Sequence, residues 1–568
     1  MRFKSWQIEF FYINEQRNEG SNVKKSLNYL LIALITIMIV LAGCSAAKST
    51  SEETSKNATE GEITPGGELK WALGGTVTND NLDAHKSGNA QNGRVMRSLY
   101  DSLVVELEDG TIKPWLATSW EISEDKKSYT FKLREDVTFH DGTPFNAEAV
   151  KFNFDRIIDP ATKASNSINA LGPYESSEVI DEFTVKINFS TPFAPFLSNA
   201  AKADLGMVSP AAVKKYGDAF PQHPVGTGPF KLKKFTLGTQ VELVKNEDYN
   251  WAPENAGHKG PAYLDKITIQ FVPEEATRVG VLQSKQVYAA DIIPPQNLVA
   301  LKKDNQFNVL ETQLSQINFS LYLNPSKEPW NDVRVRKAVR SALDIKSAVD
   351  TIYLGTSEQA WSPITKNLFG YDDKVENSWK QDVDETAKQL KEAGWKKGSK
   401  GLWEKEGKPL TIDLIDTQGN REKRIDLITV LQKQLKDAGI QLNIVSLSAG
   451  AYDKRRFDGD YDMFAASQFY GDPDVMRLIF STKGPYGLAT PSRANVPELD
   501  EWLEQGYLEQ DPQKRQEIYK KVQEYIIENV YSIPTYLFNY SFATVKEVKG
   551  IRFDSPGFPN FYDTWIQQ

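Results

Sequence analysis

The chain has 568 residues, of which 40% are hydrophobic and 25% charged. This is the profile of a globular protein too long for one compact core, so we expect two or more lobes. A net charge of −9 without a basic cluster argues against nucleic acid as a partner, and a single cysteine excludes an intrachain disulfide and a cysteine-based zinc site.

That cysteine, Cys44, ends an N-terminal pattern typical of secretion. A positive pair, Lys24-Lys25, precedes an apolar run over Tyr29–Val40, and Leu-Ala-Gly-Cys follows. The run is shorter than the ~20 residues of a membrane-spanning helix. Leu-Ala-Gly-Cys resembles a bacterial lipobox, which implies a lipid-modified Cys44 as the mature N-terminus. We predict a signal peptide over 1–43, with translation starting at Val23 because a mixed, charged segment precedes it.

The segment 44–64 is rich in Ser, Thr, Glu and Lys and nearly free of bulky apolar residues, which indicates a flexible tether. From there the apolar pattern changes to a period of two. Leu69, Trp71 and Leu73 alternate with other residues and predict a first strand, and Met96–Leu103 is predicted as a helix or the end of one.

The stretch from Pro114 to Ile158 predicts a hairpin, a turn and a helix. Apolar residues at every second position over 129–133 predict one hairpin strand, and His140-Asp141-Gly142 is a turn signal. Asn146 is placed to cap an amphipathic helix that runs to Ile158.

Strands and helices interleave along the rest of the chain, which favours α/β lobes. Pro224–Phe230 contains a lone Gly-x-Gly and is predicted as a loop by which the chain returns to the sheet of the first lobe. Further predicted strands are Gln240–Lys245, Ile267–Pro273, Tyr288–Asp291, Leu410–Leu414, Leu442–Leu447 and Asp462–Ala466. Predicted helices are 332–343, Arg424–Ala438 and 511–530. Asp332 is expected to cap the first, whose arginines are expected on a solvated face, and Gly439 is expected to end the second.

The wording of the 114–158 stretch is distinctive. PWLATSWEISED, YTFKLR, FHDGTPFNAEAV and FNFDR follow one another in order, and this sequence resembles the signature of the bacterial extracellular solute-binding proteins of family 5, the peptide-, nickel- and opine-type receptors of ABC importers. The resemblance implies a two-lobed periplasmic-binding-protein-like α/β fold of type II, of the large class with an extra subdomain, in which helices flank mixed sheets.

The resemblance also implies a division of the chain and a ligand site between its lobes. Lobe I is expected to comprise 65–100, 225–312 and 540–568, with 101–224 as its extra subdomain, and lobe II to comprise 313–539. Ligand contacts to both lobes are expected to favour a closed state through a hinge motion.

Catalytic motifs are missing from the sequence. It has no Gly-x-Ser-x-Gly, no His-Glu-x-x-His and no phosphate-binding Gly-Lys-Ser/Thr loop. Its four histidines show no metal-ligand spacing, and none follows His258. We therefore predict a binding protein without enzymatic activity, cofactor or bound metal.

Two loops are candidates for the ligand site because loops at strand ends hold ligands in α/β proteins. The first is 467–474, in which Phe469, Tyr470 and Asp472 are the candidate ligand contacts. The alternative is that the aromatic side chains of this loop belong to the core and its carboxylates are solvated. The second, 416–421, offers Asn420 and Arg421.

Peptide-binding family members receive the peptide carboxylate on an arginine in this second loop, and that position falls on Gln418 or Arg421, of which only Arg421 carries a charge. Their amino-group aspartate falls on Phe469, so Asp472 is the substitute, provided that the loop bends differently. Trp361 is added as an aromatic candidate in lobe II.

The expected function is that of an extracytoplasmic substrate-binding lipoprotein, a monomer that captures di- or oligopeptides and delivers them to the permease and ATPase subunits of an ABC importer. A receptor for chelated nickel, another metal chelate or an opine-like solute is the alternative, and a surface lipoprotein without a transport role is a third possibility. In either receptor case the protein lies on the outer face of the cell membrane, held by its lipid.

Overall fold

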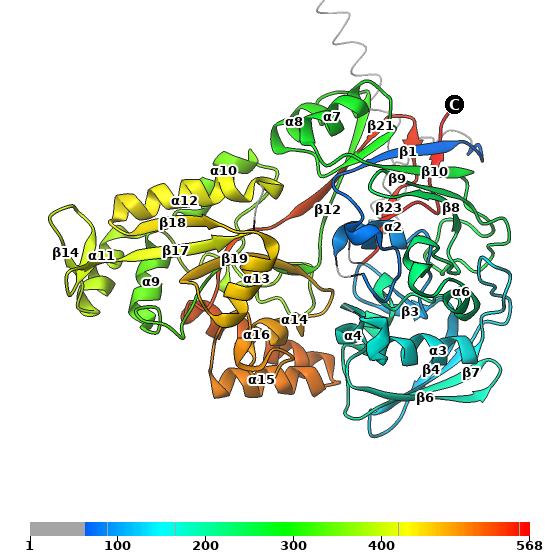
Figure 1. The fold of residues 1–568 in the computed structure, drawn as a ribbon, viewed down its shortest axis with the longest axis horizontal. Coiled ribbons are helices and arrows are strands. Elements are labelled where there is room, and N and C mark those ends of the chain that lie inside the picture. The colour runs from blue at the N-terminus through cyan, green and yellow to red at the C-terminus, as the bar shows by residue number, and fades with distance from the viewer. Residues whose placement is uncertain (1–62, 88, 165, 418–419, 556) are drawn as a thin grey trace, which may run out of the picture. The chain divides into compact units, whose positions relative to one another are not determined.

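The computed structural model describes residues 63–568 except 88, 165, 418–419 and 556, and Gly61–Gln568 form one compact unit (Figure 1). The predicted signal peptide and Cys44 lie outside the described residues. In the part of the chain that is described, no helix is both long and apolar enough to cross a membrane.

A seven-stranded mixed sheet forms the base of the first lobe. Its strand order is β12 (Phe307–Gln313), β21 (Asn539–Val545), β11 (Ala289–Asp291), β1 (Glu68–Leu73), β10 (Lys266–Phe271), β9 (Gln240–Lys245) and β8 (Phe230–Thr236). β1 runs parallel to β10 and β11, and the other pairs are antiparallel. The accompanying helices are α2 (Ala90–Met96), α7 (Glu275–Gln283) and α8 (Pro295–Leu301). We call residues 63–313 and 539–568 lobe I.

A four-stranded antiparallel sheet within lobe I contains the predicted hairpin. Its order is β4 (Ala117–Ile122), β5 (Ser128–Leu133), β7 (Thr184–Phe189) and β6 (Tyr174–Asp181). Tyr129, Phe131 and Leu133 are buried, as their alternation predicts. Asn146 caps α3 (Ala147–Ile158), since its side chain accepts a hydrogen bond of 3.1 Å from the backbone N–H of Ala149. Shorter elements are α4 (Asn166–Leu171), α5 (Phe196–Ala200), α6 (Pro210–Tyr216), β2 (Val104–Glu106) and β3 (Ile112–Pro114).

A five-stranded mixed sheet forms the base of the second lobe. Its order is β18 (Gln441–Ser446), β17 (Thr411–Asp416), β19 (Met463–Phe469), β13 (Gln316–Leu323) and β20 (Ile533–Tyr536). Its helices are α9 (Val333–Ser341), α10 (Ile345–Tyr353), α11 (Val383–Glu392), α12 (Arg424–Ala438), α13 (Ala449–Asp458), α14 (Val475–Phe480), α15 (Pro497–Leu508) and α16 (Pro512–Glu528). We call residues 316–536 lobe II; in Figure 1 its sheet lies to the left of the seven-stranded sheet.

Remaining strands are short. They are β14 (Lys396–Lys397), β15 (Trp403–Lys405) and β16 (Lys408–Pro409) in lobe II, and β22 (Val548–Lys549), β23 (Arg552–Phe553), β24 (Pro559–Asn560) and β25 (Trp565–Ile566) in the C-terminal part of lobe I.

Two chain crossings join the lobes, and they lie in one antiparallel ribbon. β12 belongs to the seven-stranded sheet and β13 to the five-stranded sheet, so the chain crosses over residues 314–315. It returns over residues 537–538, between β20 and β21. Because β12 pairs with β21 and β13 with β20, the two crossings are adjacent, an arrangement that suits a hinge between the lobes.

The structure corrects three sequence-based expectations. Of the two alternatives for Met96–Leu103, a helix or the end of one, the first is wrong, because α2 ends at Met96. Strand β19 continues to Phe469, three residues beyond its predicted end. The arginines of α9 do not all form a solvated face: Arg336 is 3% exposed and donates to the carbonyl oxygen of Asn529, a partner 193 residues away.

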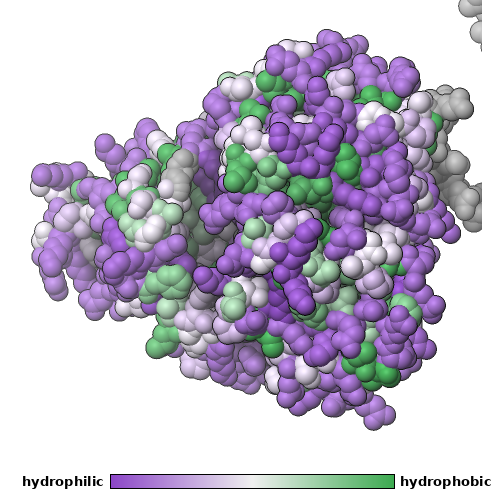
Figure 2. Space-filling view, turned by 45° about the vertical axis from the view of Figure 1, so that its right-hand side comes forward, coloured by the Kyte–Doolittle hydropathy of each residue, from purple (hydrophilic) through white to green (hydrophobic). Residues whose placement is uncertain are grey.

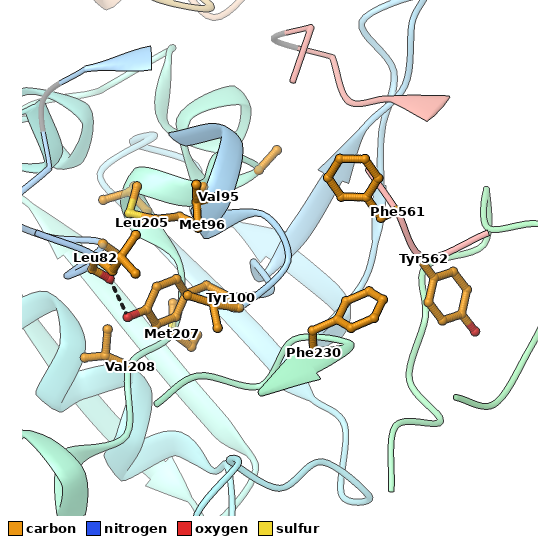
Figure 3. Close-up of a cluster of buried hydrophobic side chains, with 14 of the residues drawn as sticks. Leu82, Val95, Met96, Tyr100, Leu205, Met207, Val208, Phe230, Phe561 and Tyr562 are labelled. Atoms are coloured by element: carbon orange, nitrogen blue, oxygen red, sulfur yellow. Dashed lines mark hydrogen bonds between the residues drawn. The ribbon is translucent and has the colours of Figure 1, made fainter. Parts of the chain in front are cut away.

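A cluster of buried apolar side chains joins α2 to the segment that follows α5 (Figure 3). Val95 and Met96 of α2 pack with Leu205, which lies at the end of the short 3-10 turn Ala203–Leu205. The hydroxyl of Tyr100 donates a 2.8 Å hydrogen bond to the carbonyl oxygen of Leu82 in the same cluster. The turn is therefore anchored by a fully buried leucine.

The loop Pro224–Phe230 leads into β8, as predicted, and packs against the chain after α2. A Cβ atom on Gly228 would lie 2.5 Å from the backbone carbon of Leu99 and 2.7 Å from the carbonyl oxygen of Ser98. Backbone atoms cannot swing aside as side chains do, so only glycine fits here.

Replacing Gly228 by Ala should therefore lower the free energy of unfolding by about 1–3 kcal/mol through overpacking. Gly280→Ala is the matched control, since nothing lies within 4 Å of its added Cβ and alanine favours a helix interior. Urea titration of both variants provides the comparison; equal stability would show that the loop relaxes freely.

Candidate ligand-binding cleft

A cavity of about 300 Å³ lies between the two lobes. Its lobe I lining includes Asn89, Gln91, Arg94, Asn166, Asp204 and Phe558. Its lobe II lining includes Gln316, Arg421, Glu422, Arg424, Ser467 and Phe469. Leu314 and Phe538, one from each crossing, complete it. The cavity therefore lies at the hinge, where closure of the lobes changes its shape.

The segment before α12 presents two arginines to this cavity. Glu422 and Lys423 both have left-handed backbone conformations, with φ of 55° and 59°. Non-glycine residues rarely adopt this region, and such strain concentrates at functional sites. Asn420 supports the turn, because its side-chain oxygen accepts hydrogen bonds of 3.0 and 3.2 Å from the backbone N–H groups of Ile425 and Asp426.

A single carboxylate, Glu422, lies between Arg421 and Arg424. Arg424 donates to it at 2.7 Å, and the hydroxyl of Tyr536 donates at 2.9 Å. The Nε atom of Arg421 is 3.4 Å from its other oxygen. Burial alone would raise the pKa of Glu422, but Arg424 and Arg421 lower it to about 2. The charged residues that line this side of the cavity are two guanidiniums and one carboxylate, so their formal charges sum to +1.

The two arginines differ in the exposure of their side chains and in the number of contacts that they make within the protein. Arg424 has a side chain only 13% exposed; it also donates to the hydroxyl of Ser467 at 2.8 Å and lies 4.4 Å over the ring of Phe319. Arg421 has a side chain 56% exposed, and Arg424 lowers its pKa. Arg421 is therefore the guanidinium free to receive an anion, while Arg424 holds Glu422 in place.

The lobe I wall combines amides with two charged residues. Arg94 lies 3.3 Å from the buried carboxylate of Asp291 and 4.4 Å over the ring of Tyr540. Asn89 caps α2, since its side chain accepts from the backbone N–H of Asn92 at 3.0 Å. Asp204, in the turn anchored by Leu205, is the other charged residue of this wall.

Of the predicted residues, Arg421 and Phe469 line the cavity. Phe469 stacks on Phe558 of lobe I, with ring centroids 4.7 Å apart. Asn420 is not among the residues that line it, and its side chain instead caps α12. Trp361 is not among the residues that line it and packs edge-on against Trp379 at 5.5 Å.

Tyr470 and Asp472 are buried in other contacts. The hydroxyl of Tyr470 is 3.4 Å from the carbonyl oxygen of Asn169 in lobe I, and the amine of Lys202 lies 5.0 Å from its ring. Asp472 accepts two hydrogen bonds from Arg515, at 2.6 and 3.0 Å. The alternative with core aromatics and solvated carboxylates therefore fits Tyr470 and not Asp472.

Most of the lining residues are not identifiable from the sequence, and three of them carry charges that matter for the site: Arg424, Glu422 and Asp204. Arg424 is the first residue of a predicted helix, and a Glu between arginines is common on surfaces. Asp204 carried no sequence signal, because its role depends on the fold of the Ala203–Leu205 turn.

A larger cavity of about 710 Å³ lies elsewhere, among residues 97–115, 201–202, 229–256, 310–311 and 551–563. All of these belong to lobe I. Closure of the lobes cannot enclose a ligand there from two sides, so the interlobe cavity is the better candidate.

Figure 2 shows a largely hydrophilic outer surface with scattered apolar patches.

Comparisons with known proteins agree with this geometry. Residues 111–488 match the family described as bacterial extracellular solute-binding proteins, family 5. The probable D,D-dipeptide-binding periplasmic protein DdpA of Escherichia coli is 31% identical over 454 residues, which cover 77% of this chain and 82% of DdpA.

Solved structures give the same result. The periplasmic binding protein DppA of Helicobacter pylori, in complex with peptide STSA, has a TM-score of 0.75 at 25% identity and covers 89% of this chain and 99% of its own. NikA of Brucella suis, in complex with Fe(III)-EDTA, has a TM-score of 0.77 at 26% identity and covers 88% and 100%.

The Asp472–Arg515 pair generates a stability prediction. Asp472→Asn would keep the shape but leave the Arg515 guanidinium buried without its counter-charge, since the side chains are 5% and 9% exposed. We expect a loss of about 3–5 kcal/mol in the free energy of unfolding. Asp437→Asn, which breaks the exposed Lys433–Asp437 pair, should change it by less than about 0.5 kcal/mol. Chemical denaturation of both variants tests this; matching values would mean that water reaches Arg515.

Proposed function

Because the chain belongs to family 5 of the bacterial extracellular solute-binding proteins, we propose that it captures a short peptide between its lobes and delivers it to the permease of an ABC importer. Like its relatives, it is a receptor of the extracytoplasmic face and not an enzyme. The observation that supports the peptide most directly is Arg421, an exposed guanidinium in a cavity lined by both lobes.

Arginine suits the peptide carboxylate because its planar fork can donate two parallel hydrogen bonds. Glu422 contacts the guanidinium of Arg421. It does not cancel the positive charge of this side of the cavity, because Arg424 shares the same carboxylate. A ligand carboxylate would bring the charge of this wall to zero.

The volume of the cavity favours a small ligand. About 300 Å³ is at the lower end of the ~300–1,000 Å³ of small-molecule sites. A di- or tripeptide fits this range better than a long peptide. Arg94, Asn89, Gln91 and Asn166 supply polar groups on the opposite wall for the peptide backbone.

A carboxylate-bearing metal chelate or opine-like solute is the second candidate. NikA, a structural neighbour, was solved with Fe(III)-EDTA, and three arginines line the present cavity. Among the residues that the structure describes, no group of three His, Cys, Asp or Glu could hold a metal directly. A metal would therefore enter within its chelator, bound through the chelator's carboxylates.

We further propose that Cys44 carries a lipid that holds the receptor at the membrane, with 44–64 as the tether. The support is the Leu-Ala-Gly-Cys sequence after a positive and then an apolar segment. Such a link keeps the receptor near its permease at high local concentration.

The ligand class can be found by thermal-shift screening with L-Ala-L-Ala, D-Ala-D-Ala, the tetrapeptide Ser-Thr-Ser-Ala and Fe(III)-EDTA. A ligand that binds only the folded state raises the melting temperature, by an amount that grows with its concentration relative to Kd. The ligand with the largest shift becomes the probe for the variants below.

Arg421→Ala should weaken binding of a free-carboxylate peptide by ~10- to 100-fold, because a charge-assisted hydrogen bond contributes about 1.5–3 kcal/mol. The C-terminal amide of the same peptide should lose much less. Calorimetric titration gives both affinities.

Arg455→Ala removes an equal charge from a partly exposed position of lobe II outside the cavity and is the matched control. Equal losses for acid and amide would show that Arg421 does not bind the carboxylate. Unchanged affinity for both would place it outside the binding site.

Cys44→Ser should release the receptor from the membrane fraction or leave it unprocessed, because serine offers no thiol for acylation. Cell fractionation with metabolic labelling by a fatty acid measures both effects. A labelled, processed protein in the membrane fraction of this variant would refute the anchor.

A further inference from the structure

The two walls of the cleft carry opposite unsatisfied charges. On lobe II, Arg421 and Arg424 share Glu422 and leave one positive charge. On lobe I, Arg94 is neutralised by Asp291, which leaves Asp204. A ligand that fills this cavity therefore meets a cationic wall on one side and an anionic residue on the other.

Asp204 is held firmly in position. It is the middle residue of the Ala203–Leu205 turn, whose flanking side chains are 5% and 0% exposed. Leu205 packs beside Met96 and Val95 of α2, the helix that also presents Arg94 to the cavity (Figure 3). The carboxylate position is thus fixed relative to the rest of the lobe I wall.

The cations nearest to Asp204 in the fold are committed to other partners. Lys202 donates to the side-chain oxygen of Asn199 at 2.7 Å. Arg97 donates to Asp554 and to the carbonyl oxygen of Ala201, both at 2.9 Å. Within the described residues, no hydrogen bond or ion pair ends on the Asp204 carboxylate.

Asp204 is half-buried, which is unfavourable for a carboxylate without a hydrogen-bonding partner. Burial raises the pKa of Asp204 to about 6, although Lys202 and Arg97 act to lower it. A cation placed next to it would restore the charged form and satisfy its oxygens. Among the described residues, no other carboxylate lines the lobe I wall, and β19 contributes Ser467, Gln468 and Phe469 to the cavity.

We propose that Asp204 accepts the amino group of the ligand whose carboxylate is bound by Arg421, so that the cleft selects a zwitterion held at its two ends by opposite lobes. This inference rests on the proposed peptide-binding function and extends it to the amino end. It gives Asp204 a specificity-determining role and places a negative residue where a polycarboxylate chelate would be repelled.

A mechanical consequence follows from this division of the two contacts. A peptide with both ends free makes a charged contact with each lobe and favours the closed arrangement, whereas a peptide with a blocked amino end lacks the charged contact with lobe I. A ligand shifts a conformational equilibrium only by its differential affinity for the two states. N-acetylated peptides should therefore bind weakly and close the lobes poorly.

The test compares the best peptide from the thermal-shift screen with its N-acetyl form by calorimetric titration. Wild-type protein should bind the free form ~10- to 100-fold more tightly. Asp204→Asn should lose that preference while keeping its affinity for the N-acetyl form, and Asp204→Glu should retain part of it. Asp218→Asn, an exposed change on the same lobe outside the cavity, should behave as wild type.

The outcomes separate the inference from the proposed function. Equal affinity of wild-type protein for the free and acetylated peptides overturns the role of Asp204, even if both Asp204 variants fail to fold. So does an equal loss of both ligands in Asp204→Asn. In either case, selective loss of the free acid over its amide in Arg421→Ala would leave peptide binding intact. Binding of no peptide at all overturns both.

Discussion

The cleft depends on one buried carboxylate between two guanidiniums. Glu422 sits in a strained, left-handed turn and is fixed by Arg424 and Tyr536. An isolated buried charge of this kind would be expensive, but two arginines supply more charge than it needs. The surplus appears on Arg421, the more exposed of the two. The local fold thus converts a structural ion pair into a site with an unused positive charge.

The position of this site at the hinge links binding to lobe movement. Leu314 and Phe538 lie in the two crossings and line the same cavity as Arg421. A rotation about the paired strands β12–β13 and β20–β21 therefore changes the distance between the wall with Arg421 and the wall with Asp204. A ligand that contacts both walls is sensitive to that rotation, whereas one that contacts a single wall is not.

Elements whose determinants are local are predictable from the sequence. Helix α12 has its predicted bounds, because its apolar spacing and Gly439, with φ of 86°, define it within one segment. The family signature predicts the fold, and the loop 416–421 predicts that Arg421 lies in the cleft. Contacts between residues far apart in the sequence are not predictable in this way. Arg336 donates to a residue 193 positions away, and Asp472 accepts from Arg515 of α16. Asp204 becomes a cleft residue only when α2 and the Ala203–Leu205 turn pack together.

The contacts that join the lobes beside the cavity are individually weak. Lys423 and Glu275 form an ion pair of 2.9 Å, with side chains 21% and 33% exposed, and the Tyr470–Asn169 hydrogen bond is long at 3.4 Å. A partly exposed ion pair contributes about 0–1 kcal/mol, whereas each charge-assisted hydrogen bond contributes about 1.5–3 kcal/mol. A ligand that forms such bonds at both ends therefore outweighs these contacts. Under the proposed binding mode, closure of the lobes depends on a ligand with two charged ends rather than on the intrinsic affinity of the lobes for each other.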